Sequence, residues 1–364
     1  MEQLRVPGPT PLPGEVLKAI SRQMINHRGP EFRQMFKDVT EKLKIVFQTK
    51  NDLLILTGSG TGGLEAAVVN MLSPNDKVLA VSIGVFGDRF ANIAKTFGAD
   101  VTKLSFEMGK PADPEAIRKA LNADPGIKAV LVTHNETSTA VTNDLKSIAR
   151  IVKDEFGKLL IVDGISSIGS IDLPVDEWKI DVAISGSQKG WMVPPGMTML
   201  SVSQEAWKAH ANAKMPRFYW DLTKAKTSLE KGETPWTPAI SVVYGFSVSL
   251  DMMLKEGLPA IFNRHAQVAK AAREGAKALG LKLLVADEKY ASNTVTAIMG
   301  TDGLDPKKLN QIMREQYKIV LAGGQGALEG KIFRIGHLGW VTVDDIKDIM
   351  AHLKLALPQA GFKQ

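Results

Sequence analysis

The feature that most constrains the fold of this chain is a series of short apolar runs separated by segments of helical periodicity. Continuous apolar runs of this kind are typical of strands buried on both faces of a sheet. The predicted strands are Leu53–Leu56, Val78–Val81, Val101–Leu104, Ala129–Val132, Leu159–Val162, Val182–Ile184 and Met197–Val202. The helices expected before and between them are 32–47, 61–72, 88–97, 114–122 and 143–156, the last capped by Asn143. The pattern predicts an α/β protein with a mostly parallel sheet and room for a mixed edge.

The pattern changes after a polar and proline-rich stretch at about 220–240. A long helical stretch is expected over 241–280. Short strands are expected at Lys282–Val285, Val295–Met299 and Ile332–Ile335, with helices at about 305–316 and 343–357. These elements predict a smaller α+β domain, which the N-terminal segment could complete.

The composition excludes several classes of protein. The 364 residues include no cysteine, which excludes disulfides, thiolate metal ligands, iron–sulfur clusters and a cysteine nucleophile. The net charge of +6 is spread without a run of like charges, so a nucleic-acid partner is not expected. No apolar run is long enough to span a membrane, and no apolar signal-peptide core follows Met1. We therefore predict a cytoplasmic protein with no membrane partner and no metal site.

A glycine-rich turn at residues 58–63 is the first candidate site. It joins a predicted strand to a predicted helix, so its backbone N–H groups and the helix dipole would favour a phosphate. The turn contains the spacing G-x-G-x-x-G, but the next strand ends in Ser82 and Ile83 without an acidic residue for a ribose. It also lacks the Gly-Lys-Ser/Thr of a nucleotide-triphosphate loop. A dinucleotide site and an ordinary tight turn remain open alternatives from the residues alone.

Two charged residues follow predicted strands further along the chain. Asp163 ends one apolar strand, and Lys189 lies just beyond the next among small residues. Ligands of open α/β sheets bind at the carboxyl ends of the strands, where a partly desolvated lysine becomes a competent nucleophile. Each residue alone is more often an ordinary polar group. Together, a phosphate cradle, an aspartate and a lysine in this order match what pyridoxal phosphate requires.

Six ordered motifs give the chain a resemblance to a known family, the class V, fold-type I aminotransferases of the alanine–glyoxylate, serine–glyoxylate and serine–pyruvate branch. The motifs are Pro7–Thr10, Gly58–Thr61, Thr133–Thr139, Val162–Asp163 with Ser185–Lys189, Thr234–Pro238 and Phe333–Gly336. The resemblance implies a central, mostly parallel sheet with helices on both faces. It also implies an N-terminal segment (1–20) packed on the small domain and active site, a large pyridoxal-phosphate-binding domain (21–250) and a small C-terminal domain (251–364).

The resemblance also implies a role for individual residues. Lys189 would hold the cofactor covalently and move the substrate α-proton, Asp163 would pair with the pyridine nitrogen, and Arg334 would bind the substrate carboxylate beside Gly8. The other expected cofactor contacts are Ser59, Gly60, Thr61, Phe86, Thr137, Gln188 and, from the partner of a homodimer, Thr237.

The expected function is transfer of an amino group from alanine or serine to glyoxylate or pyruvate by a ping-pong mechanism. An aspartate/2-oxoglutarate aminotransferase is the second candidate, and it needs a further cation such as Arg28 or Arg217 for the distal carboxylate. The missing cysteine excludes a cysteine desulfurase with a persulfide relay, whereas a lyase without a thiol relay stays open. A non-catalytic scaffold that keeps the fold is the alternative from another class, and a nicotinamide dehydrogenase rests only on the glycine spacing.

Overall fold

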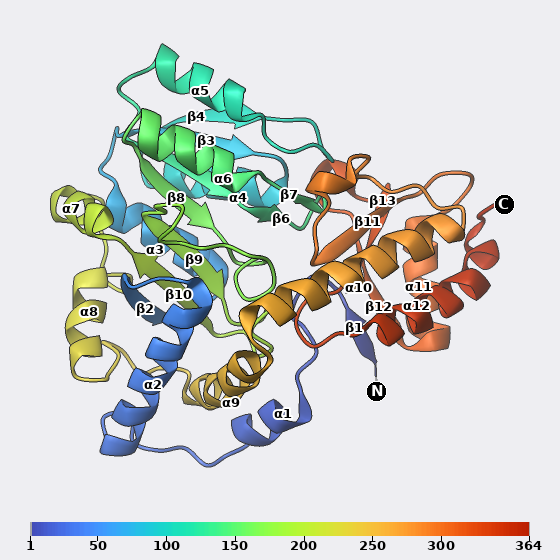
Figure 1. Cartoon of the computed structure of the whole chain (residues 1–364), viewed down its shortest axis with the longest axis horizontal. Helices are drawn as coiled ribbons and strands as arrows, with labels where there is room; N and C mark the ends of the chain where they lie inside the picture. Colours follow the sequence, from blue (N-terminus) through green and yellow to red (C-terminus); the bar gives the residue numbers. More distant parts are fainter. Residues whose placement is uncertain (1, 364) are drawn as a thin grey trace.

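The large lobe of the molecule is built on a seven-stranded sheet. The computed structural model describes residues 2–363. The sheet has the order β2-β10-β9-β8-β5-β3-β4, and β10 alone runs in the direction opposite to the other six strands (Figure 1). Its strands are β2 (Asp52–Thr57), β3 (Lys77–Ser82), β4 (Asp100–Ser105), β5 (Ala129–Thr133), β8 (Leu159–Asp163), β9 (Val182–Gly186) and β10 (Met197–Val202). Every strand predicted between residues 53 and 202 is confirmed, because long apolar runs leave little alternative to a buried strand.

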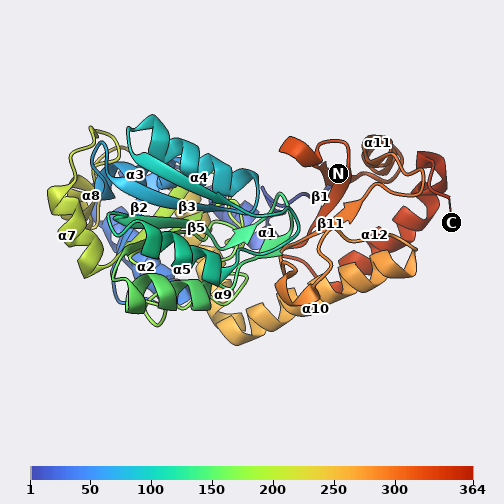
Figure 2. The ribbon, with the colours of Figure 1, turned by 90° about the horizontal axis from the view of Figure 1, so that it is seen from above.

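Two layers of helices cover the two faces of this sheet. Successive residues of β2 point to opposite sides, so that Leu53 and Ile55 pack in one core and Leu54 and Leu56 in the other. One core also holds α2, α5, α6 and α9, and the other holds α3, α4, α7 and α8; of the latter, α3 and α4 lie above the sheet in Figure 2. These helices are α2 (Pro30–Phe47), α3 (Gly60–Met71), α4 (Val85–Thr96), α5 (Pro114–Ala123), α6 (Leu145–Ala149), α7 (Gln204–Asn212), α8 (Leu222–Glu230) and α9 (Ile240–Glu256).

The second lobe is organised around a four-stranded sheet of order β1-β12-β13-β11, in which β1 is blue and the other strands are orange to red in Figure 2. Its strands are β1 (Gln3–Arg5), β11 (Val295–Met299), β12 (Ile319–Gly323) and β13 (Ile332–Gly336), and its helices are α10 (Leu258–Ala278), α11 (Pro306–Tyr317) and α12 (Val343–Ala356). Strand β1 pairs in parallel with β12, so the N-terminal segment joins the sheet of the C-terminal lobe. The proposed division after residue 250 falls inside α9, and the domain boundaries stay a prediction.

The remaining elements are short. They are α1 (Gly14–Ile20), the two-stranded ladder β6 (Asn135–Glu136) and β7 (Val141–Thr142), a π-helix at Arg150–Glu155, and 3₁₀ turns at Glu288–Tyr290, Gly326–Leu328 and Pro358–Ala360. No helix among residues 2–363 is both long and apolar enough to cross a membrane.

Three local predictions were wrong. The helix expected over 241–280 is two helices, because Gly257 adopts φ 84° between α9 and α10. The helix after β7 is capped by Asp144, whose side chain accepts from Ser147 N, whereas the Asn143 amide donates to Thr133 O. The stretch 282–285 forms only an isolated bridge between Leu283 and Ile298, whereas β12 was missed.

Candidate active site

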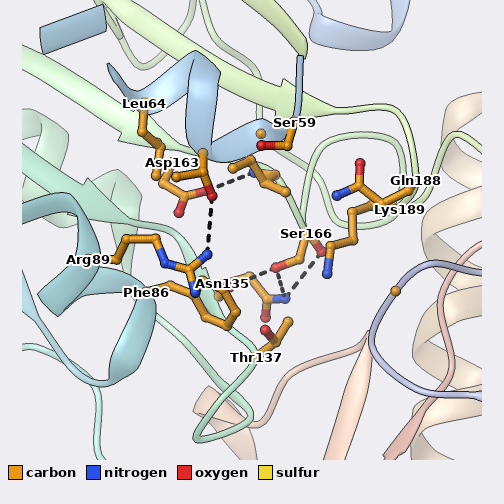
Figure 3. Close-up of a pocket in the computed structure, with 14 residues that line it drawn as sticks. Ser59, Leu64, Phe86, Arg89, Asn135, Thr137, Asp163, Ser166, Gln188 and Lys189 are labelled. Atoms are coloured by element: carbon orange, nitrogen blue, oxygen red, sulfur yellow. Dashed lines mark hydrogen bonds between the residues drawn. The ribbon is translucent and has the colours of Figure 1, made fainter. Parts of the chain in front are cut away.

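A cavity of about 240 Å³ opens at the carboxyl edge of the large sheet (Figure 3). Strands β2, β3, β5, β8 and β9 all end beside it, as expected for a ligand site in an open α/β sheet. The cavity is lined by Gly8, Ser59, Gly60, Thr61, Leu64, Phe86, Arg89, Asn135, Thr137, Asp163, Ile165, Ser166, Gln188 and Lys189. Residues separated by up to 181 positions therefore face one space.

The N-terminus of α3 forms one wall. Ser59 is the N-cap residue, yet its side chain makes no capping hydrogen bond. A Cβ on Gly60 would lie 2.6 Å from Ile165 Cδ1, and a Cβ on Gly63 would lie 2.1 Å from Thr198 Oγ1. These glycines let the helix pack closely on the sheet while its first N–H groups and the Ser59 hydroxyl face an incoming anion.

Asp163 ends β8 with its carboxylate facing the cavity (Figure 3). The side chain is buried and accepts a 3.0 Å hydrogen bond from Ile165 N. Among the described residues it forms no ion pair within 4.0 Å. Burial, with a smaller contribution from the charge of Glu136, raises the pKa of Asp163 to about 7. The charges of Lys189 and Arg89 lower this pKa by less than burial raises it, so the site holds a carboxylate without a direct ionic partner among residues 2–363.

Lys189 enters the cavity from the loop after β9, on the side opposite Asp163 in Figure 3. Its Nζ donates to Pro7 O, in the segment that follows β1. Burial lowers the pKa of the Lys189 amine to about 8, although the charge of Asp163 acts in the opposite direction. A neutral, nucleophilic amine is therefore accessible near neutral pH.

Gly8 lies directly against this lysine. Its φ is 120°, which side-chain-bearing residues rarely adopt, and a Cβ there would lie 2.7–2.9 Å from Lys189 Cδ, Cε and Nζ. Because glycine has no side chain, position 8 leaves room for the Lys189 amine.

The other predicted site residues are not all in the cavity. Phe86, Thr137 and Gln188 line it, and the buried Gln188 Oε1 has no hydrogen-bond partner among residues 2–363. Arg334 lies behind the Thr137 wall, where its Nη1 donates to Thr137 O at 2.8 Å and its Nε to Gly323 O at 2.9 Å. Thr237 is exposed and does not line this chain's own cavity.

Arg89 is a cavity residue that the sequence reasoning missed. Its guanidinium lies 4.7 Å from the centroid of the Phe86 ring, and its Nη1 donates to Thr61 Oγ1 at 3.2 Å. Residues three positions apart share a face of a helix, so the expected role of Phe86 in α4 was a signal that could have found it. Asn135 and Ser166, which bond to each other, were missed as well.

Neither arginine considered for a distal carboxylate lines the cavity. Arg28 Nη1 is 2.7 Å from a Glu233 oxygen, and Arg217 Nη1 donates to three backbone carbonyls of the α3 and α7 region. Within this chain, both arginines therefore bind groups outside the cavity.

The polar groups of the cavity fit pyridoxal phosphate. The start of α3 offers donors for a phosphate, the Asp163 carboxylate can pair with a protonated ring nitrogen, and Lys189 can bind an aldehyde carbon. The unpartnered Gln188 side chain is a further polar contact that a ligand could complete.

Comparison with known proteins gives a consistent result. Residues 4–338 match the family described as Aminotransferase class-V. A soluble hydrogenase 42 kDa subunit of Anabaena cylindrica is 44% identical over 98% of this chain and 94% of its own length. A serine–glyoxylate aminotransferase of Methylorubrum extorquens is 38% identical over 99% and 92%, and an L-aspartate–glyoxylate aminotransferase of Paracoccus denitrificans is 38% identical over 93% and 86%. The solved structure of an alanine–glyoxylate aminotransferase from Nostoc sp. superposes with a TM-score of 0.94 at 29% identity, covering 98% of this chain and 95% of that one.

Proposed function

The chain belongs to the class-V aminotransferases, and on that premise we propose that it moves the amino group of alanine or serine to glyoxylate or pyruvate. Its cofactor is pyridoxal phosphate, as in the family. The observation that carries the proposal is geometric: one cavity holds the buried Asp163 carboxylate, which forms no ion pair within 4.0 Å among the described residues, together with the Lys189 amine. The small donors are supported by the serine–glyoxylate and alanine–glyoxylate enzymes among the similar proteins.

Different cavity residues would bind different parts of the cofactor. Ser59, Gly60, Thr61 and Gln188 would bind the phosphate, and Asp163 would keep the ring nitrogen protonated. Phe86 and Thr137 would fix the plane of the ring. When bound, pyridoxal phosphate withdraws electrons from the substrate α-carbon.

Lys189 does the proton transfer in this proposal. Its Nζ would hold the cofactor covalently and, once an amino acid takes its place, would accept the proton from the substrate α-carbon. A pKa of about 8 suits an amine that must accept and return a proton near neutral pH. The donor leaves as a 2-oxo acid before the acceptor binds, which predicts ping-pong kinetics.

Arg334 would orient the substrate. Its planar guanidinium suits bidentate binding of an α-carboxylate, and its bonds to Thr137 O and Gly323 O hold the side chain in one orientation. Gly8 would keep the space beside Lys189 open for the substrate.

The test is a half-reaction followed by visible absorbance. Protein loaded with pyridoxal phosphate is mixed separately with alanine, serine and aspartate, without an acceptor. We expect the absorbance band of the lysine-bound cofactor to disappear with alanine or serine. A response to aspartate alone would contradict the choice of donor.

Aspartate is the second candidate donor, favoured by the L-aspartate–glyoxylate aminotransferase among the relatives. It needs a cation near the distal carboxylate, and Arg28 could act only from a partner subunit. The variant Arg28→Gln should then reduce aspartate turnover more than alanine turnover. Equal losses for the two donors would count against this role.

A non-catalytic role in a larger assembly is suggested by the name of the hydrogenase subunit. A chain without cysteine cannot offer thiolate ligands to a metal cluster. Amino-group transfer by the purified chain alone would contradict a purely structural role.

A homodimer is also part of the proposal. Phe218 and Tyr219 are 70% and 43% exposed and both stack on Trp236, which directly precedes Thr237. An exposed aromatic patch beside a predicted cofactor contact is typical of an interface. Sedimentation of the wild type and of Phe218→Ala tests this, since the substitution should weaken the dimer. The cytoplasmic location stays a prediction.

A further inference from the structure

Glu136 is a fully buried carboxylate next to the cavity that none of the roles above uses. Its exposed fraction is 0%, and it accepts four hydrogen bonds. Phe86 N and Gly87 N each donate to Oε2 at 3.0 Å, while Ser138 N and Ser138 Oγ donate to Oε1 at 3.0 and 2.5 Å. The carboxylate is therefore shared between the first turn of α4 and the loop after β6.

The backbone is shaped around this carboxylate. A Cβ on Gly84 would lie 2.6 Å from Glu136 Cγ and 2.5 Å from Ser138 Oγ, so only glycine lets the chain close over the side chain. Ser138 Oγ also accepts from Val85 N at 3.0 Å. Three successive N–H groups at the start of α4 are thus satisfied by Glu136 and Ser138, which fixes this end of the helix.

The donors to Glu136 come from two different walls of the site, one in α4 and one in the loop after β6. Phe86 lines the cavity from α4, where it would contact the cofactor ring. Thr137 lies between Glu136 and Ser138, and its carbonyl accepts from Arg334 Nη1 at 2.8 Å. A shift of the Glu136 carboxylate would consequently move the backbone of Phe86 and the carbonyl that orients Arg334.

We propose that Glu136 is a positioning residue that fixes the cofactor wall and the substrate-binding arginine relative to each other. The proposal rests on the proposed function, because it uses the roles of Phe86 and Arg334. Glu136 itself does not line the cavity, so it would touch neither cofactor nor substrate.

The variant Glu136→Gln tests the link with little change of volume. An amide offers one acceptor oxygen, so either Phe86 N and Gly87 N or Ser138 N must lose a partner. Because hydrogen bonds to a charged group are the strong ones, we expect cofactor affinity to fall and the donor KM at saturating cofactor to rise, each by about tenfold.

Two matched variants separate this effect from its alternatives. Asp181→Asn changes another buried carboxylate, which lies at the opposite edge of the sheet and accepts from Leu160 N and Lys153 Nζ. It should lower thermal stability and leave both constants unchanged. Ser59→Ala should weaken cofactor binding alone, because Ser59 has no bond to the Arg334 wall.

The result that supports the proposal is a joint change of cofactor affinity and donor KM in Glu136→Gln. A loss of thermal stability alone, as in Asp181→Asn, or a change of one constant alone, as in Ser59→Ala, would overturn it. If Glu136→Gln fails to fold, Ser138→Ala removes one of the four bonds and should shift both constants by a few-fold in the same direction. A wild type that binds no pyridoxal phosphate would overturn the proposed function, and this inference with it.

Discussion

Each of the two edges of the large sheet carries a lysine, an aspartate and a serine at the N-cap of a helix. These residues bond to one another at one edge and do not at the other. At the amino edge, Lys153 Nζ lies 2.5 Å from Asp181, and Ser203 Oγ both donates to Asp181 and accepts from Ala206 N at the start of α7. At the carboxyl edge, Lys189, Asp163 and the α3 cap residue Ser59 form no such bonds to one another.

The difference separates stability from function. Buried charges that are paired and hydrogen-bonded hold a structure together, whereas buried charges left unpaired cost stability and persist where a ligand completes them. At the amino edge, the polar groups find their hydrogen-bond and ion-pair partners within the chain. We interpret the carboxyl edge as one whose polar groups find their partners in the bound cofactor.

Replacing Lys189 should have the largest effect. Lys189→Ala removes the covalent attachment and the proton-transferring amine together, so turnover should fall by at least about a thousandfold. Transamination by the purified variant is measured against Lys189→Arg, which retains a charge but supplies no comparable nucleophile. Substantial activity in either variant would contradict the assigned role.

Asparagine at the two buried aspartates should change stability in opposite directions. The folded-state pKa of Asp163 is raised from 3.8 to about 7, so the cofactor-free protein loses up to about 4 kcal/mol of stability as pH rises through this window. Asp163→Asn removes that penalty and should be more stable than the wild type at pH 8 but not at pH 4.

Asp181→Asn should instead destabilise the protein by about 3 kcal/mol, because Lys153, whose side chain is only 12% exposed, loses its charged partner. Urea unfolding of cofactor-free protein at both pH values measures both variants. Destabilisation of similar size at pH 8 by both substitutions would remove the distinction between the edges.

A methyl group at position 8 should affect cofactor binding at the carboxyl edge and leave the amino edge unchanged. Gly8→Ala places a Cβ against the Lys189 side chain at a φ of 120°, so we expect cofactor affinity to fall by about tenfold. Gly14→Ala is the matched control, since a Cβ there has no atom within 4 Å. Titration with pyridoxal phosphate compares them, and equal affinities would mean that Lys189 rearranges freely.

The two serine caps should give the smallest and most diagnostic contrast. Ser203→Ala removes a used cap and should cost about 1 kcal/mol of stability without changing cofactor affinity. Ser59→Ala should leave stability unchanged and weaken cofactor binding about fivefold. Thermal unfolding and cofactor titration of both variants check this, and a reversed pattern would place the anion site elsewhere.

The sequence predicted the parts of the molecule that depend on local pattern. The buried strands and the strand-end positions of Asp163 and Lys189 follow from apolar runs and their boundaries. The break at Gly257 was missed because a single glycine in a helical pattern does not reveal its positive φ.

The parts that depend on long-range contact could not be read from the sequence. The approach of Gly8 to Lys189 joins residues 181 positions apart, and the four bonds of Glu136 combine β6 with α4. Arg89 had a local signal in its spacing from Phe86, but its bond to Thr61 depends on how α4 packs beside α3.

The most direct test is the visible absorbance of cofactor-free protein titrated with pyridoxal phosphate, in the wild type and in Lys189→Ala. We expect the wild type to develop the band of a lysine-bound cofactor, which alanine or serine then removes, and the variant to develop none. A wild type that forms no such band, or a variant that forms the same one, would contradict the assignment of the carboxyl edge as the cofactor site.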